Sequence, residues 1–125
     1  MARTPTPAGG IPTRAFLATG IGLGLAVWVL SPWLTDLAEP WDSAGPWWTV
    51  SWLLVALAGG AAGRLRGAAL PLGYALGQML ATLPAAGGGF GLLGWLYIGA
   101  FALAACLVSL AVAGTVALLR RWRGR

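Results

Sequence analysis

The chain has 125 residues, of which 58% are hydrophobic and only 9% are charged. Soluble globular domains carry about 25% charged residues, and the mean hydropathy here is +0.79. The composition therefore excludes an ordinary soluble domain and predicts a membrane protein. The net charge of +5 does not indicate a nucleic-acid partner, because the arginines stand singly or in short groups beside apolar segments.

Four apolar segments are long enough to cross a hydrocarbon core about 30 Å thick, which takes roughly 20 helical residues. They are residues 15–34, 46–63, 67–84 and 92–119. The third segment contains Pro71 and several polar residues, and it fits either a full crossing or a re-entrant helix. We expect an all-α bundle of four transmembrane helices over residues 15–119. Residues 1–14 are expected to form a disordered cytoplasmic tail, and residues 120–125 a basic cytoplasmic tail.

The charges are divided between the two ends of these predicted helices. All eight arginines precede the first helix, separate the second from the third, or follow the fourth. The three acids, Asp36, Glu39 and Asp42, lie between the first helix and the second. Because cytoplasmic segments are enriched in Lys and Arg, we expect both termini in the cytoplasm and a multi-pass location in the bacterial cytoplasmic (inner) membrane.

The connection between the first two predicted helices contains the sequence EPWDSAGPWW, residues 39–48. Its prolines and Gly45 predict a turn that is not helical. Glu39, Trp41 and Asp42 are candidates for recognition by an outer partner, and the alternative is a solvated loop that follows the charge rule. Tryptophan favours membrane interfaces, so several aromatic residues are expected at the outer interface. They are Trp33, Trp41, Trp47, Trp48, Trp52, Trp95 and Tyr97.

Tyr74, Gln78 and Thr82 recur at four-residue spacing and share one face of the third predicted helix. Such a face either lines a solute path or forms hydrogen bonds between helices. The second interpretation is favoured, because proton- and ion-coupled paths use ionisable groups and no Asp, Glu, Arg or His lies inside a predicted span.

Small residues also recur at four-residue spacing, which favours close helix packing within the bundle or between copies. The pairs are Gly20 with Gly24, Gly59 with Gly63, Gly73 with Gly77, and Ala100 with Ala104.

Neither catalysis nor metal binding is expected from these residues. The chain has no histidine and no lysine, so its serines lack the usual bases of nucleophilic catalysis. The three clustered acids do not make up a metal site of four protein ligands, and the single Cys106 excludes a cysteine pair. We expect no enzymatic activity and no cofactor.

Three short motifs resemble a family of small, uncharacterised bacterial integral membrane proteins with four helices. The motifs are Glu39-Pro40-Trp41-Asp42 between the first two predicted helices, Gly77-Gln78 in the third, and residues 89–94 opening the last. The resemblance covers most of residues 15–119. It implies the four-helix architecture and no particular activity.

The functional hypothesis is a structural or accessory role, with the lipid bilayer and either a second copy or another membrane protein as partner. The alternative is an oligomeric small transporter or channel for a neutral or weakly polar solute, lined by Tyr74, Gln78 and Thr82. The two hypotheses differ in the role of Gln78. In a solute path its side chain contacts the solute, whereas in helix packing it stabilises the bundle.

Overall fold

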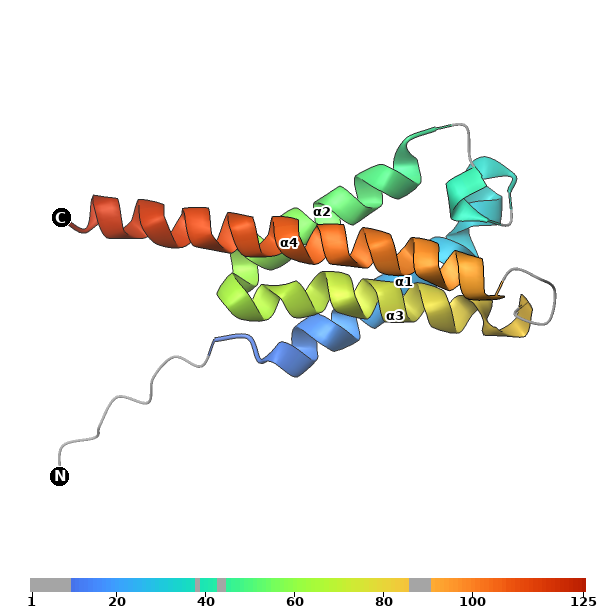
Figure 1. Ribbon diagram of the computed structural model, residues 1–125, viewed down its shortest axis with the longest axis horizontal. Helices are drawn as coiled ribbons and strands as arrows, with labels where there is room; N and C mark the ends of the chain where they lie inside the picture. The colour runs from blue at the N-terminus through green and yellow to red at the C-terminus, as the bar shows by residue number, and fades with distance from the viewer. Residues whose placement is uncertain (1–9, 38, 43–44, 86–90) are drawn as a thin grey trace, which may run out of the picture.

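A computed structural model describes residues 10–37, 39–42, 45–85 and 91–125, and these residues form helices and no strand (Figure 1). The all-α fold class is therefore confirmed. The α-helices are α1 (Thr13–Thr35), α2 (Trp47–Gly63), α3 (Ala69–Thr82) and α4 (Gly91–Arg123). Three short 3-10 helices stand between them, namely η1 (Pro40–Asp42), η2 (Arg64–Ala68) and η3 (Leu83–Ala85).

Three helical stretches of the described chain are long and apolar enough to cross a membrane. They are Thr13–Asp42, Trp47–Thr82 and Gly91–Arg123. The middle stretch contains α2, η2 and α3, and Figure 1 shows α2 and α3 running in opposite directions on either side of η2. The 14 residues of α3 extend about 21 Å, and η3 continues the same helix to about 27 Å, at 1.5 Å per α-helical and 2.0 Å per 3-10 residue.

The helix ends follow from local backbone chemistry. Asp36 adopts a φ of 58° and donates its backbone N–H to the Pro32 carbonyl, which ends α1 with a left-handed residue. Pro46 is the N-cap of α2, so the helix begins at Trp47. The prediction that the prolines keep the Glu39–Pro40 region from being helical was wrong in part. Pro40–Asp42 forms one 3-10 turn, because proline presets φ and needs no donor in a first turn.

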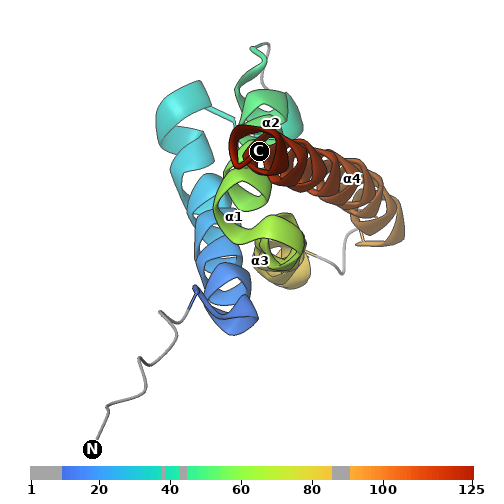
Figure 2. The ribbon, with the colours of Figure 1, turned by 90° about the vertical axis from the view of Figure 1, so that its left-hand side faces the viewer.

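The helices pack as two pairs, α1 with α3 and α2 with α4. Helix α1 lies along α3, whereas α4 packs against both α2 and α3, and α1 and α2 barely touch. Figure 2 shows the same arrangement from the end, with α1 and α4 on opposite sides of the bundle. The core is formed by residues from all four helices, among them Phe16, Trp52, Tyr74 and Ile98.

Glycines bring α1 and α3 into backbone contact. A Cβ at Gly20 would meet the Leu70 carbonyl oxygen and come within 2.9 Å of the Gly73 Cα, and a Cβ at Gly77 would meet the Ile21 carbonyl oxygen. These distances leave no room for any side chain. The small residues predicted at four-residue spacing in α1 and α3 therefore pack directly against one another. This pair of faces is consequently buried inside the chain and is not free for a second copy.

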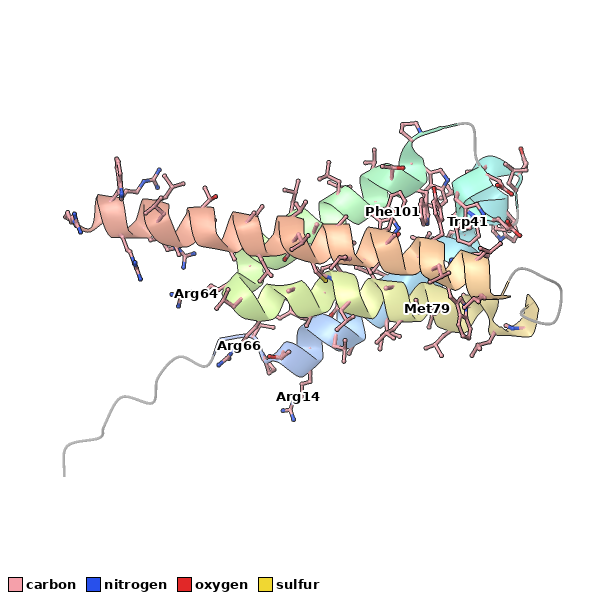
Figure 3. All side chains as sticks on the ribbon, in the orientation of Figure 1. Arg14, Trp41, Arg64, Arg66, Met79 and Phe101 are labelled. Carbon is pink, nitrogen blue, oxygen red and sulfur yellow. The ribbon has the colours of Figure 1, made fainter. Side chains whose placement is uncertain are left out.

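Within the described residues, the arginines and Trp41 lie at opposite ends of the molecule. Figure 3 shows Arg14, Arg64 and Arg66 at the end where α4 finishes, and Trp41 at the other end. Helix α4 has 33 residues, about 50 Å, and its last turns extend beyond η2 (Figure 1). The helix continues through Arg123, so most of the predicted basic tail is its last turn, where positive charge complements the helix dipole.

Candidate functional site

The polar face predicted on α3 is turned into the bundle. Tyr74, Gln78 and Thr82 are each no more than 1% exposed. Burying a polar group without a hydrogen bond costs free energy, so each of these side chains needs a partner inside the protein. The structure supplies one from another helix in every case.

Gln78 connects α3 to both α1 and α2. Its Oε1 accepts hydrogen bonds from the indole N–H of Trp48 at 2.9 Å and from that of Trp28 at 3.4 Å. Two donors on one oxygen fix the orientation of the amide, because the flipped form would set its NH₂ group against both indoles. Gln78 Nε2 has no hydrogen-bond partner within the described part of the chain.

Tyr74 is hydrogen-bonded to Ser51 of α2, with 2.6 Å between the two hydroxyl oxygens. The Ser51 hydroxyl also lies 2.6 Å from the Trp48 carbonyl oxygen, to which it donates. A serine hydroxyl has a single proton, so Tyr74 must be the donor to Ser51. The chain of donors from Tyr74 through Ser51 ends on the backbone of α2.

Thr82 connects α3 to α4. Its hydroxyl donates to the Met79 carbonyl oxygen at 2.7 Å and accepts the indole N–H of Trp95 at 2.9 Å. The three polar residues of α3 thus bond to α1, α2 and α4 together. Their helical spacing was visible in the sequence, but their partners Trp28 and Ser51 were missed. The only available signal was that each is a hydrogen-bonding residue inside an otherwise apolar span.

Aromatic rings from all four helices surround Gln78 and Tyr74, and we call this group the aromatic core. It comprises Trp28, Trp41, Trp48, Trp52, Tyr74, Tyr97 and Phe101. Trp48 lies at its centre, with its ring centroid 4.5 Å from that of Phe101 and 5.4 Å from the stacked ring of Tyr97. Edge and stacked pairs of this kind stabilise a fold beyond the area they bury.

The aromatic core corrects part of the predicted interfacial belt. Trp48 and Trp52 are only 3% and 2% exposed, so they pack inside the protein and cannot face headgroups. Trp33 is 85% exposed and points away from the bundle, as a lipid-facing ring would. Sequence position alone does not separate the two kinds of tryptophan, because both stand near helix ends.

The Glu39–Asp42 element covers the end of the aromatic core. The Trp41 ring lies 5.0 Å from Trp28 and 5.7 Å from Trp48, and its indole N–H donates to Glu39 Oε2 at 3.0 Å. Pro40, the first residue of this turn, is buried. Of the three residues considered for outer recognition, Glu39 and Trp41 are therefore engaged within the chain, whereas the Asp42 side chain is exposed.

An open groove separates α1 from α2 and has a volume of about 390 Å³. Its walls include Leu23, Val27 and Leu54, and Leu70 and Tyr74 of α3 form its floor. Neither Gln78 nor Thr82 lines it. The groove is therefore an apolar surface feature and not a continuation of the polar face of α3.

Within the residues that the structure describes, no group of three or more His, Cys, Asp or Glu is placed to hold a metal ion. Comparison with models of protein families, with curated proteins and with solved structures finds no match for this chain. The features that bear on function are therefore the polar face of α3, the aromatic core and the arginine end.

Proposed function

We propose that this chain is a small integral membrane protein with a structural or accessory role, and that α1 to α4 each cross the membrane. The reversal of the chain at η2 supports four crossings, because α2 and α3 run in opposite directions through the bundle. Arg14, Arg64 and Arg66 lie at the end where α4 finishes, which supports a cytoplasmic location for both termini.

We also propose that the protein resides in a bacterial cytoplasmic membrane. It would share its architecture with the small bacterial proteins that it resembles in the Glu39–Asp42 element and in Gly77-Gln78. In this architecture, the apolar groove between α1 and α2 faces the acyl chains of the bilayer.

The main support for the accessory role is that Gln78 is buried and hydrogen-bonded to two other helices. This side chain is 0% exposed, and its oxygen accepts two indole N–H groups from two other helices. A residue held in this way contributes to the cohesion of the bundle, and moving it into a path would break both bonds. Tyr74 and Thr82 are held by the same kind of contact. The transporter hypothesis receives less support, because the groove beside Tyr74 is apolar.

The experiment that tests this proposal is the substitution Gln78→Leu in the full chain reconstituted in lipid. Removal of the acceptor breaks the hydrogen bonds from the indoles of Trp28 and Trp48, so we expect a loss of about 1–3 kcal/mol in the free energy of unfolding. Thr115→Val is the matched control, because Thr115 is exposed and bonds only to its own helix at the Ala111 carbonyl. We expect this control to stay within about 0.5 kcal/mol of the parent chain.

Solute flux and co-purification complete the test. We expect proteoliposomes of the parent chain and of Gln78→Leu to show the same low permeability to neutral solutes, and gentle extraction into nanodiscs to retain a stoichiometric membrane-protein partner. A solute flux that Gln78→Leu abolishes without any loss of stability would contradict the accessory role and support transport.

A further inference from the structure

The arginine end of the molecule contains a surface pocket of about 460 Å³. It lies between the residues that lead into α1 and the turn that joins α2 to α3. We call it the arginine pocket, and its lining consists of Gly10 and Ile11, Ala62 and Gly63, and the three residues 64–66 of η2. Its volume falls within the range of about 300–1,000 Å³ typical of small-ligand sites.

We propose that the arginine pocket binds the headgroup of an anionic phospholipid at the membrane surface. Two arginines, Arg64 and Arg66, line the pocket. Guanidinium groups bind phosphate oxygens in a bidentate manner, which makes arginine well suited to a phosphodiester. The three acids of the chain follow α1 and lie at its opposite end, so they do not neutralise this pair.

The start of α1 adds positive potential to the same place. Pro12 is the N-cap and provides no side-chain hydrogen bond, and helix geometry leaves the N–H groups of Thr13 and Arg14 without an intrahelical acceptor. The positive end of the helix dipole favours an anion there. Arg14 is the first charged residue of α1 and lies at this end of the bundle (Figure 3).

Apolar side chains beside the arginines favour a lipid over a free phosphate ion. Leu65 stands between Arg64 and Arg66 and is 73% exposed, and Ile11 on the opposite wall is 53% exposed. Exposed aliphatic groups around a cationic pocket match a ligand that has a phosphate and acyl chains in one molecule. Inorganic phosphate would engage the arginines and leave both aliphatic groups in water.

The backbone of Arg64 gives the proposal a separate test. Arg64 has a φ of 55° and a ψ of −136°, a conformation that glycine adopts far more readily than arginine. If this position were only a turn, glycine would serve it better. The presence of arginine at position 64, in spite of this backbone conformation, is explained if its side chain binds the headgroup.

The first experiment compares two double variants of the full chain that each lose two charges at the same end. Arg64→Gln with Arg66→Gln removes the pocket pair, and Arg121→Gln with Arg123→Gln removes a pair from the exposed last turn of α4. The probe is phosphatidylglycerol, with phosphatidylcholine as the neutral lipid, added to the detergent-solubilised protein. The measurements are the lipid retained in native mass spectrometry and the unfolding temperature.

We expect the parent chain to retain phosphatidylglycerol selectively. Each basic residue near an anionic surface contributes about fivefold in affinity, so the pocket variant should lose about 25-fold and the α4 variant little. Equal losses in both variants would mean general surface electrostatics and would overturn the site, as would unchanged retention in both. Equal protection by inorganic phosphate alone would overturn the lipid as the ligand.

The second experiment uses Arg64→Gly, with Arg123→Gly as its control. We expect Arg64→Gly to raise the unfolding temperature in neutral lipid, because it relieves the left-handed arginine, and to lose about fivefold in phosphatidylglycerol binding. A variant that is more stable yet binds lipid as the parent does would refute the role of Arg64. This proposal requires only that the arginine end meets a membrane surface, so its failure leaves the accessory role and the Gln78→Leu result untouched.

Discussion

At Trp41, one indole ring meets rings from three different helices. Its centroid lies 5.0 Å from Trp28 of α1, 5.7 Å from Trp48 of α2 and 5.9 Å from Tyr97 of α4. Its N–H is bonded to Glu39, two residues earlier. A single side chain in the connection between α1 and α2 thus holds three helices together at one end.

This contact predicts unequal effects for two tryptophans that look alike in the sequence. We expect Trp41→Leu to lower the free energy of unfolding by about 2–4 kcal/mol, because it removes ring contacts and leaves a poorly filled site. Trp33→Leu should change it by less than about 0.5 kcal/mol, since Trp33 is 85% exposed. Thermal unfolding in one lipid composition measures both, and equal losses would show that Trp41 acts only as an interfacial ring.

Part of the candidate site could be predicted at the residue scale. The four-residue spacing placed Tyr74, Gln78 and Thr82 on one face, and the absence of ionisable groups in the spans favoured hydrogen bonding between helices. Their partners could not be predicted, because Trp48 was expected at the outer interface and Trp28 was given no role. Which indole turns inward depends on how the helices are rotated, and rotation is a property of the packed bundle.

At the scale of the elements, α1 and α3 approach closely because the glycines at their contact have no side chains. A Cβ at Gly77 would meet the Ile21 carbonyl oxygen and lie 3.0 Å from the Gly24 Cα. Helices in a bilayer gain little from apolar burial against one another, so close backbone packing is their main source of association. The α1–α3 pair depends on this packing.

We therefore expect Gly77→Ala to destabilise the bundle by about 1–3 kcal/mol through overpacking. Gly22→Ala is the matched control, because Gly22 lies in α1 with no atom within 4 Å of the added Cβ. That variant should be neutral or more stable by up to about 1 kcal/mol, the usual gain of alanine over glycine in a helix. Unfolding in detergent or nanodiscs separates the two, and similar behaviour of both would contradict the proximity of α1 and α3.

The helical elements illustrate where sequence reasoning succeeds and where it stops. Apolar length predicted the helices, and the glycine spacing predicted close packing without showing which faces meet. Gly73 and Gly77 looked available for a second copy until the structure placed them against α1. The helical form of the turn at Pro40–Asp42 was also missed, because proline breaks a helix in its interior but is favoured in a first turn.

At the scale of the whole molecule, the count of crossings decides which segments share a side of the membrane. Four crossings put η2 and the end of α4 on one side and the Glu39–Asp42 element on the other. If Trp47–Thr82 formed a single crossing, the end of α4 would instead share a side with Asp42. The two arrangements differ in an observable way.

Cysteine labelling in a Cys106→Ala background measures this difference. We expect a membrane-impermeant maleimide to reach Leu65→Cys and Gly124→Cys from the same side, and Asp42→Cys from the opposite side. Leu107→Cys is the control, because Leu107 is exposed in the middle of α4 and should stay unlabelled from either side. Labelling of Gly124→Cys and Asp42→Cys from one side would exclude four crossings.

The close spacing of the indoles also predicts a strong near-ultraviolet circular dichroism signal. Trp28, Trp41, Trp48 and Trp52 follow one another at centroid separations of 5.0–6.0 Å, nearly at right angles. Chromophores this close and this fixed in angle exchange excitation and couple their transitions. The folded bundle should consequently have an intense near-ultraviolet circular dichroism signal that vanishes when the helices part inside the lipid, even while each remains helical. Assembly and helix formation can thus be followed separately in the unlabelled chain.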